Sequence, residues 1–195
     1  MGGYKTQEIN PIIGCENIIT NESNNVEYYD PEDWVELYNP TNESIEIGLW
    51  EFKDENNVFK FPEGVILKSG QYLVLCRDTI PFKSNFPHIN NIIGDLNFGL
   101  SGSGEQIILY NSENELIDEL EYDDTVPWPK EPDGNGPTLE LIHPSLDNNL
   151  GSNWAASEMN GGTPGKVNSV YVVDSLNEQS SGIVINEINY NSADE

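Results

Sequence analysis

Short segments in which apolar and polar residues mix or alternate recur along this chain, and turn-forming residues separate them. Glycine, proline, asparagine and aspartate stand between the segments, as they do between the strands of antiparallel sheets. Apolar residues at helical spacing are nearly absent. The pattern therefore predicts an all-β fold, as a sandwich or barrel rather than an α/β protein. The expected strands are 33–38, 45–52, 58–61, 71–77, 105–110, 115–122 and 138–142.

Residues 105–122 are expected to form a hairpin. In 116–122, Leu116, Leu120 and Tyr122 fall on one face, opposite two glutamates, which is the period of two of a half-buried strand. The preceding segment 111–114 supplies turn-forming Asn and Ser residues. The hairpin is the clearest local prediction of the pattern.

Charge limits the classes of partner. The 34 Asp and Glu residues outnumber the eight Lys and Arg residues, which gives a formal net charge of −26. So few cations displace few counterions from a phosphate backbone, and we expect no nucleic-acid partner. No segment reaches the roughly 20 apolar residues of a membrane span, so we expect no membrane insertion. The 195 residues suffice for one main domain that buries about 70% of its unfolded surface.

Cysteine chemistry is sparse. Cys15 and Cys76 lie far apart and without the spacing of a metal-binding pair, so neither a disulfide framework nor a zinc cluster is predicted. A single bridge between them stays open. Cys76 ends the apolar run 72–75, which favours a buried thiol.

Several short motifs, in order, resemble the lamin-tail domain. The segment 33–40 is similar to the acidic-aromatic second strand of that family, and 104–109 is similar to its Gly-Glu hairpin entry. The strand 117–122, the turn 133–136 and the glycine-rich segment 161–165 complete the bacterial variant of the pattern. This resemblance implies an immunoglobulin-like β-sandwich, noncatalytic, in a larger bacterial protein that is extracellular or on the cell surface.

The resemblance also divides the chain. We expect an N-terminal extension with an irregular edge strand over 1–26, the sandwich over 27–168, a linker over 169–182, and a strand over 183–195. Lamin-tail domains open with a strand of the Val-Ile-Asn-Glu-Ile type, and residues 183–190 are the better copy of it. Near the N-terminus only Glu8, Ile9 and Asn10 match, and Pro11 then interrupts the ladder.

The copy at 183–190 poses a question of placement. Its aliphatic residues favour burial, and an unpaired strand offers its amides and carbonyls to any open sheet edge. Three arrangements are open: it completes its own sheet, it adds to the sheet of a neighbouring molecule, or it begins a second repeat. We hypothesise that strand addition, in cis or in trans, organises it. The predicted interaction residues are Ile183, Val184, Ile185, Glu187 and Ile188.

Catalytic signatures are not found in the sequence. The two histidines, His88 and His143, stand beside proline or an Asn-rich turn, and no nucleophile-elbow sequence accompanies them. The Ser- and Gly-rich segment 101–104 lacks the lysine and the helix of a phosphate loop. We therefore do not expect an enzyme.

Carboxylates and tryptophans leave two alternatives open. Loop carboxylates supply the oxygen ligands that calcium prefers, although no EF-hand spacing is present and a solvated acidic surface is the plainer interpretation. The calcium candidates are Glu32, Asp33, Asp123, Asp124 and Asp133. The tryptophans could offer a sugar platform, although core packing is favoured, and Trp128, between two prolines, is the one most expected to be exposed. These tryptophans are Trp34, Trp50, Trp128 and Trp154.

The sequence thus predicts a noncatalytic protein-interaction or assembly module. Its expected partner is a protein, which includes a second copy of the chain through strand addition. The alternatives are a calcium-dependent adhesin-like module and a carbohydrate-binding accessory module. No cofactor is expected apart from the calcium of the first alternative.

Overall fold

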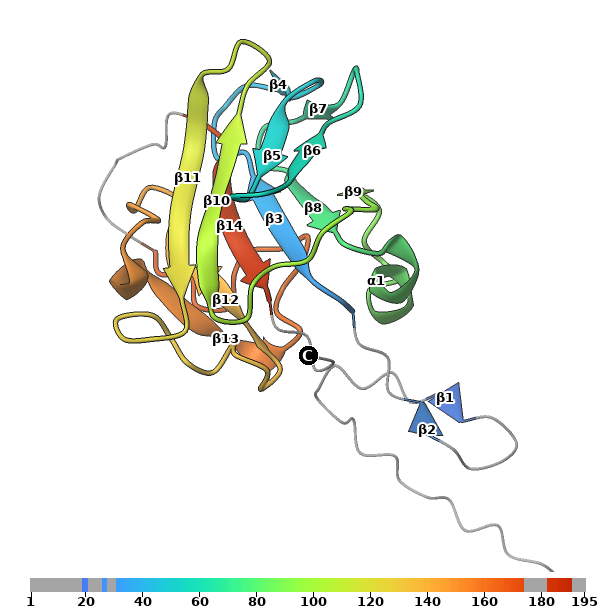
Figure 1. The fold of residues 1–195 in the computed structure, drawn as a ribbon, viewed down its shortest axis with the longest axis vertical. Coiled ribbons are helices and arrows are strands. Elements are labelled where there is room, and N and C mark those ends of the chain that lie inside the picture. Colours follow the sequence, from blue (N-terminus) through green and yellow to red (C-terminus); the bar gives the residue numbers. More distant parts are fainter. Residues whose placement is uncertain (1–18, 21–25, 28–30, 174–181, 191–195) are drawn as a thin grey trace, which may run out of the picture.

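The computed structural model describes residues 19–20, 26–27, 31–173 and 182–190. Two sheets face each other across a common core (Figure 1). The four-stranded sheet has the order β11 (Leu116–Asp123), β10 (Gly104–Tyr110), β5 (Glu51–Lys53) and β6 (Val58–Lys60). The six-stranded sheet has the order β13 (Trp154–Asn160), β12 (Pro137–Leu141), β14 (Val184–Asn189), β3 (Trp34–Tyr38), β8 (Tyr72–Cys76) and β9 (Ile92–Ile93).

Smaller elements complete the described part. Two pairs of short strands lie outside the main sheets: β1 (Ile19–Thr20) with β2 (Val26–Glu27), and β4 (Ile45–Glu46) with β7 (Ile66–Leu67). The helices are α1 (Thr79–Asn85) and the 3-10 helix η1 (Gly151–Asn153). The all-β fold that the pattern predicted and the sandwich that the resemblance implied are both confirmed.

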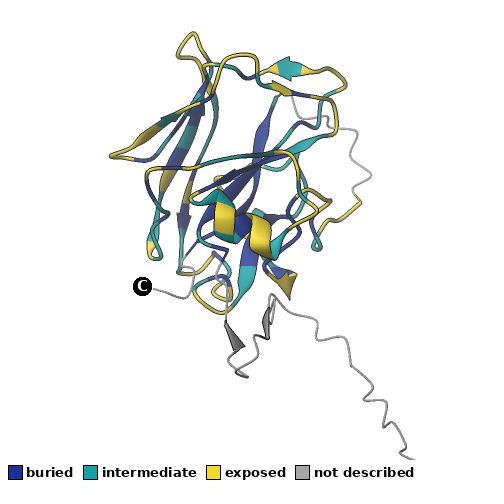
Figure 2. Ribbon diagram, turned by 90° about the vertical axis from the view of Figure 1, so that its right-hand side faces the viewer, coloured by how far each residue is buried: buried dark blue, intermediate teal, exposed yellow. Residues whose placement is uncertain are grey.

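The core forms because alternate residues of both sheets point inward. Val35 and Leu75 of the six-stranded sheet and Phe52, Leu109 and Leu120 of the four-stranded sheet are fully buried in one cluster. Figure 2 shows the buried strands in dark blue and the exposed loops in yellow. The hairpin expected at 105–122 is present as β10 and β11, in antiparallel register.

The outer face of the six-stranded sheet carries a second apolar cluster. Trp34, Val74 and Cys76 point outward there and pack with Phe82 of α1, and the Trp34 and Phe82 rings meet edge to face at 6.0 Å. The sequence pattern did not predict α1. Its start is fixed by Asp78, whose carboxylate accepts the Ile80 N–H at 2.8 Å as an N-cap.

Two other expectations are resolved by the fold. The single strand expected at 45–52 is two strands, β4 and β5, which belong to different sheets and flank Leu49, a residue with a φ of 65°. Cys76 is a free and buried thiol, whereas Cys15, the other cysteine of the bridge that the sequence left open, lies outside the described residues.

Candidate functional site

The segment 183–190 completes the sheet of its own chain. Its strand β14 lies between β3 and β12, antiparallel to both, and is the red arrow inside the sandwich in Figure 1. We call this position between β3 and β12 the strand slot. Residues 174–181, which precede the segment, lie outside the described residues, as do 191–195. In this structure the segment adopts the first of the three arrangements, and its addition to a second molecule stays a prediction.

Both faces of β14 are covered. All six of its residues are buried, whereas a strand of a half-exposed sheet buries alternate residues. On the inner face Ile185 and Ile188 are fully buried in the core. Next to them the ring of Tyr190 packs on Tyr122 of β11, with ring centroids 4.8 Å apart. The strand is thus part of the domain core and not an attachment to its edge.

A carboxylate from the opposite sheet holds the backbone of β14. The Ile185 N–H donates to Asp118 Oδ2 at 2.6 Å, and Asn148 Nδ2 donates to the same oxygen at 2.8 Å. Asp118 belongs to β11, so this contact links the two sheets. Burial raises the pKa of Asp118 to about 6, although both hydrogen bonds act to lower it.

The asparagines of β14 contact residues from three other segments. The register against β3 shifts between Ile185 and Glu187, and Asn186 lies at the shift. Asn186 Nδ2 donates to Glu36 Oε1 at 3.0 Å and to Asn168 Oδ1 at 2.7 Å. Asn189 Nδ2 donates to the Glu32 carbonyl at 2.8 Å. These contacts fix the register of the strand by side-chain identity as well as by hydrophobic pattern.

Three glutamates form a row across the outer face of the slot. Glu187 of β14 is the register partner of Glu36 on β3 and of Glu140 on β12, and all three are 0% exposed. We call these three residues the glutamate row. Burial raises the pKa of Glu36 to about 8. Burial, together with the charges of Glu36 and Glu140, raises the pKa of Glu187 well above its ordinary value.

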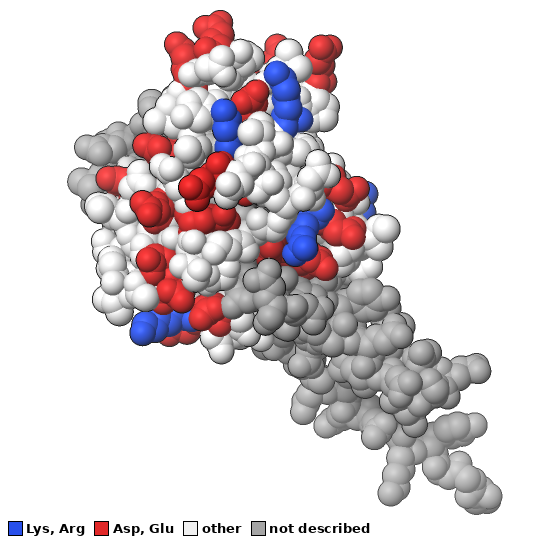
Figure 3. All heavy atoms as spheres, viewed as in Figure 1, with Lys and Arg blue, Asp and Glu red and all other residues white. Residues whose placement is uncertain are grey.

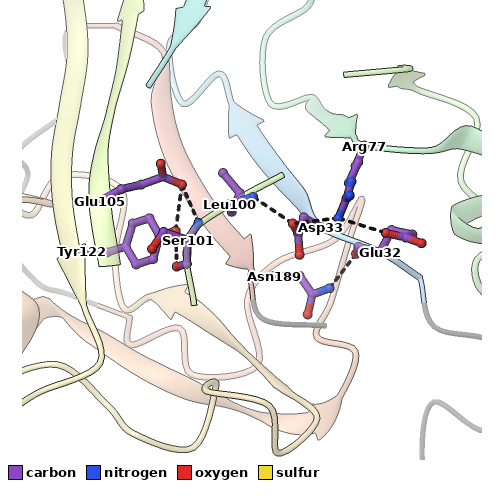
Figure 4. Close-up of polar contacts among 8 residues, drawn as sticks. All are labelled: Glu32, Asp33, Arg77, Leu100, Ser101, Glu105, Tyr122 and Asn189. Atoms are coloured by element: carbon purple, nitrogen blue, oxygen red, sulfur yellow. Dashed lines mark hydrogen bonds and ion pairs between the residues drawn. The ribbon is translucent and has the colours of Figure 1, made fainter. Parts of the chain in front are cut away.

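The calcium candidates lie in two places. Figure 4 shows Glu32 and Asp33 beside Arg77, whose Nη1 lies 3.4 Å from Glu32 Oε2 and 3.9 Å from Asp33 Oδ2. Asp33 Oδ2 also accepts the Leu100 N–H at 2.8 Å. A guanidinium therefore already neutralises this pair in part, and Asp33 joins the start of β3 to the loop before β10.

The other candidates are Asp123, Asp124 and Asp133, which are charge neighbours of Tyr190. Burial first, and then their charges, raise the pKa of Tyr190. Asp123 Oδ1 accepts hydrogen bonds from the N–H and the hydroxyl of Thr125, at 2.7 and 2.5 Å. Over the part of the chain that the structure describes, no group of three or more His, Cys, Asp or Glu is placed to hold a metal ion.

The tryptophans pack in the interior. Trp34 and Trp154 are 0% and 3% exposed, and Trp50 is 7% exposed. The expectation that Trp128 is exposed was wrong, since it is 8% exposed. Its ring meets that of Trp154 at 6.1 Å and lies over Gly151, where an added Cβ would stand 2.9 Å from the indole. The flanking prolines suggested an exposed loop, but the absence of a side chain at 151 makes room for the ring.

Sequence reasoning did not single out Asp118, Glu36 or Glu140. Asp118 lies two residues from Leu120 and Leu116, so the period of two already placed a carboxylate on the inward face of β11. Glu36 and Glu140 lie in the middle of predicted strands, where a sheet with one solvated face would expose them. Cover of the outer face by the segment 161–170 could not be seen in the pattern.

The surface of the described part is acidic. Figure 3 shows Asp and Glu side chains spread over the face in view, with fewer Lys and Arg side chains between them. Among the described residues, no helix is both long enough and apolar enough to cross a membrane.

A family model described as Lamin Tail Domain matches residues 16–124, which is more than half of the chain. No curated protein matches the chain. The matched range contains β3, β8 and the hairpin of β10 and β11, all of which the structure places in the two facing sheets. The chain therefore belongs to the lamin-tail domain family, whose domains are immunoglobulin-like and generally noncatalytic.

Proposed function

We propose that this chain is a protein-interaction or assembly module of a larger bacterial protein, located outside the cell or on its surface. Its partner is a protein, and the contact is made by completing the sheet at the strand slot. The observation that carries this proposal is the position of β14, which enters the centre of a sheet whose other strands all lie in residues 34–160. A strand at the end of the described chain thus finishes the core of the domain.

The slot offers more to a strand than the sheet edges do. A strand in the slot pairs on two sides and is covered on two faces, so main-chain hydrogen bonds and side-chain pockets both contribute. At one edge of each main sheet, a backbone amide is already taken by a side chain. The Glu121 N–H of β11 donates to Asn149 Oδ1 at 3.3 Å, and the Glu158 N–H of β13 donates to Ser169 Oγ at 2.8 Å. These hydrogen bonds make β11 and β13 poorer templates for an added strand.

The alternatives have less support among the described residues. Glu32 and Asp33 face Arg77, which reduces their need for calcium. The four tryptophans are buried and leave no indole face for a sugar. Protein recognition through the slot is the function that the geometry favours.

A disulfide trap tests whether the strand exchanges between molecules. Val35 and Ile188 are register partners in β3 and β14, so Val35→Cys with Ile188→Cys can bridge the slot to its strand. The native thiols are first removed by Cys15→Ser and Cys76→Ala. A strand from its own chain gives a bridged monomer, whereas a strand from a second chain gives a covalent dimer on a non-reducing gel.

The matched control is Val35→Cys with Leu75→Cys, because these register partners both lie within one chain whatever β14 does. After refolding at high protein concentration, we expect covalent dimers from the Val35–Ile188 pair and only monomers from the control. Monomers alone from both pairs at every concentration would refute strand addition in trans.

A further inference from the structure

The glutamate row is closed off from water and from cations. Its three carboxyl groups come from adjacent strands in direct register, and all are 0% exposed. Within residues 31–173 and 182–190, no ion pair reaches any of the three. Like charges this close in a buried site disfavour one another, so three neighbouring carboxylates cannot all stay ionised there.

Hydrogen bonds around the row are consistent with a retained proton. Glu187 Oε1 accepts from the Thr138 hydroxyl at 2.6 Å and from the Thr163 N–H at 2.8 Å. Thr163 Oγ1 lies 2.8 Å from Glu140 Oε1 and 3.5 Å from Glu187 Oε2. The hydroxyl has one proton, which serves the nearer Glu140 oxygen. A proton on Glu187 Oε2 would then donate to Thr163 Oγ1 and complete the chain from Glu187 through Thr163 to Glu140.

The neighbours of the row offer little compensating charge. Val74 of β8 pairs with Glu36, and Ala155 of β13 pairs with Glu140. Tyr72 of β8 is a titratable group outside the row that interacts with Glu36. From the covering segment, Gly165 N donates to Glu36 Oε2 at 2.5 Å. Ser169 Oγ and Val170 N donate to Glu140 Oε2 at 2.7 and 3.1 Å.

That covering segment carries one cation, Lys166, and its residue is exposed. The donors that face the row are therefore hydroxyls, backbone amides and the side-chain amide of Asn186, which stabilise one negative charge without neutralising three. The glutamate row therefore has to lower its negative charge by keeping protons on its carboxyl groups.

We propose that the strand slot takes up its strand together with a proton, because the position of Glu187 accepts a neutral carboxylic acid or an amide and disfavours a carboxylate. This inference rests on the proposed function only in treating the slot as a place where a strand enters and leaves. Glu36 and Glu140 are then specificity-determining residues, since they select a neutral polar side chain at the middle of the incoming strand. Rising pH loosens the strand.

The direction follows from the raised pKa values. An unfolded glutamate has a pKa of 4.5, whereas that of Glu36 in the fold is about 8 and that of Glu187 is also raised. Between these values the folded state holds protons that the unfolded chain has released. The stabilisation is complete below about pH 4.5 and is lost as the pH rises through about 8.

The test compares Glu187→Gln with wild type by urea unfolding of the full chain between pH 6.5 and 8.5. Asp118, with a pKa of about 6, has largely titrated below this window. Each proton held only by the folded state raises the unfolding constant up to about tenfold per pH unit. We expect the ratio of the wild-type to the Glu187→Gln unfolding constant to rise by about tenfold or more across the window. Glu121→Gln, an exposed change of the same kind on β11, should leave its ratio to wild type constant.

Two further measurements keep the proposal falsifiable. If Glu187→Gln fails to fold, Glu36→Gln provides the same comparison from the slot side. Infrared spectra at pH 6.5 should show the carbonyl band of a neutral carboxylic acid in wild type, and the band should weaken in Glu187→Gln. A constant stability ratio, or no neutral acid band, overturns the proposal. Neither result depends on the disulfide trap, so a monomeric trap would refute exchange between molecules and leave the proton uptake standing.

Discussion

Replacing Asp118 by alanine should loosen β14 without touching that strand. Asp118 is the acceptor of the Ile185 N–H and of Asn148 Nδ2, and both donors come from outside its own strand. The alanine side chain has no hydrogen-bond acceptor and does not fill the space of the Asp118 carboxylate. The two donors are left without a protein partner at the seam between the sheets.

The size of the effect follows from those two donors. A buried donor left unsatisfied costs about 1–3 kcal/mol. Asp118 is only partly buried, so water can replace it in part, and we expect Asp118→Ala to lower the free energy of unfolding by about 2–4 kcal/mol. Since burial raises the pKa of Asp118 to about 6, its contribution is greatest below pH 4 and declines as the pH rises through 6. The decrease in the free energy of unfolding caused by Asp118→Ala should therefore be larger at pH 4.5 than at pH 7.

Urea unfolding at these two pH values measures the loss, with Glu121→Ala on the exposed face of the same strand as control. Surface changes of this kind stay within about 0.5 kcal/mol. Hydrogen exchange provides a local readout, because the Ile185 amide should exchange faster in Asp118→Ala while amides in β10 change less. An Asp118→Ala variant as stable as Glu121→Ala at both pH values would refute the role assigned to this carboxylate.

Three further outcomes are expected. Deleting residues 183–195 removes four buried aliphatic side chains, whose burial stabilises the fold by about 6 kcal/mol or more. The cooperative melting transition should therefore be lost. An unchanged melting temperature and an unchanged oligomeric mass would contradict the role of the strand. Gly162→Ala and Gly64→Ala both place alanine at a positive φ, of 69° and 75°, at a cost of about 1–2 kcal/mol. Only at Gly162 would the new Cβ collide with Glu187 and Thr138. Gly162→Ala should therefore be less stable than Gly64→Ala by a further 1 kcal/mol or more, which is about the cost of overpacking a core. Equal stabilities of the two variants would count against a tightly packed glutamate row. The melting temperature should be the same in calcium and in a chelator because Arg77 already neutralises Glu32 and Asp33 in part. A higher melting temperature in calcium would support the adhesin-like alternative.

Local chemistry was enough to predict most strands but not their neighbours. The hairpin of β10 and β11 was predictable because alternation, turn residues and sequence proximity agree. The break at Leu49 was not, since a left-handed residue of this type gives no compositional signal. The helix α1 contains a proline and is short, and its buried face is defined by Trp34 on a distant strand rather than by its own periodicity.

The glutamate row shows the same limit at the level of the site. Glu36 and Glu140 are 104 positions apart in numbering, and each looks like a solvent-facing residue of an alternating strand. They become a site only because β14 brings Glu187 between them and residues 161–170 cover the face. Spacing along the chain carries no information about such a cross-strand meeting, whereas the register of the sheet does.

The two copies of the opening strand differ in how well they suit the slot. When the two copies are aligned on their shared Glu-Ile-Asn, Lys5 and Thr6 of the N-terminal copy correspond to Val184 and Ile185 of the C-terminal copy. Val184 and Ile185 are 6% and 0% exposed. A lysine or a threonine at such a position would be a buried polar group, and burying a polar group without a hydrogen-bond partner costs free energy. The copy also sets Pro11 against Tyr190, and a proline ring cannot reproduce the aromatic contact with Tyr122. Both copies keep the glutamate of the row, so the apolar flanks, rather than the central motif, favour the C-terminal strand for the slot.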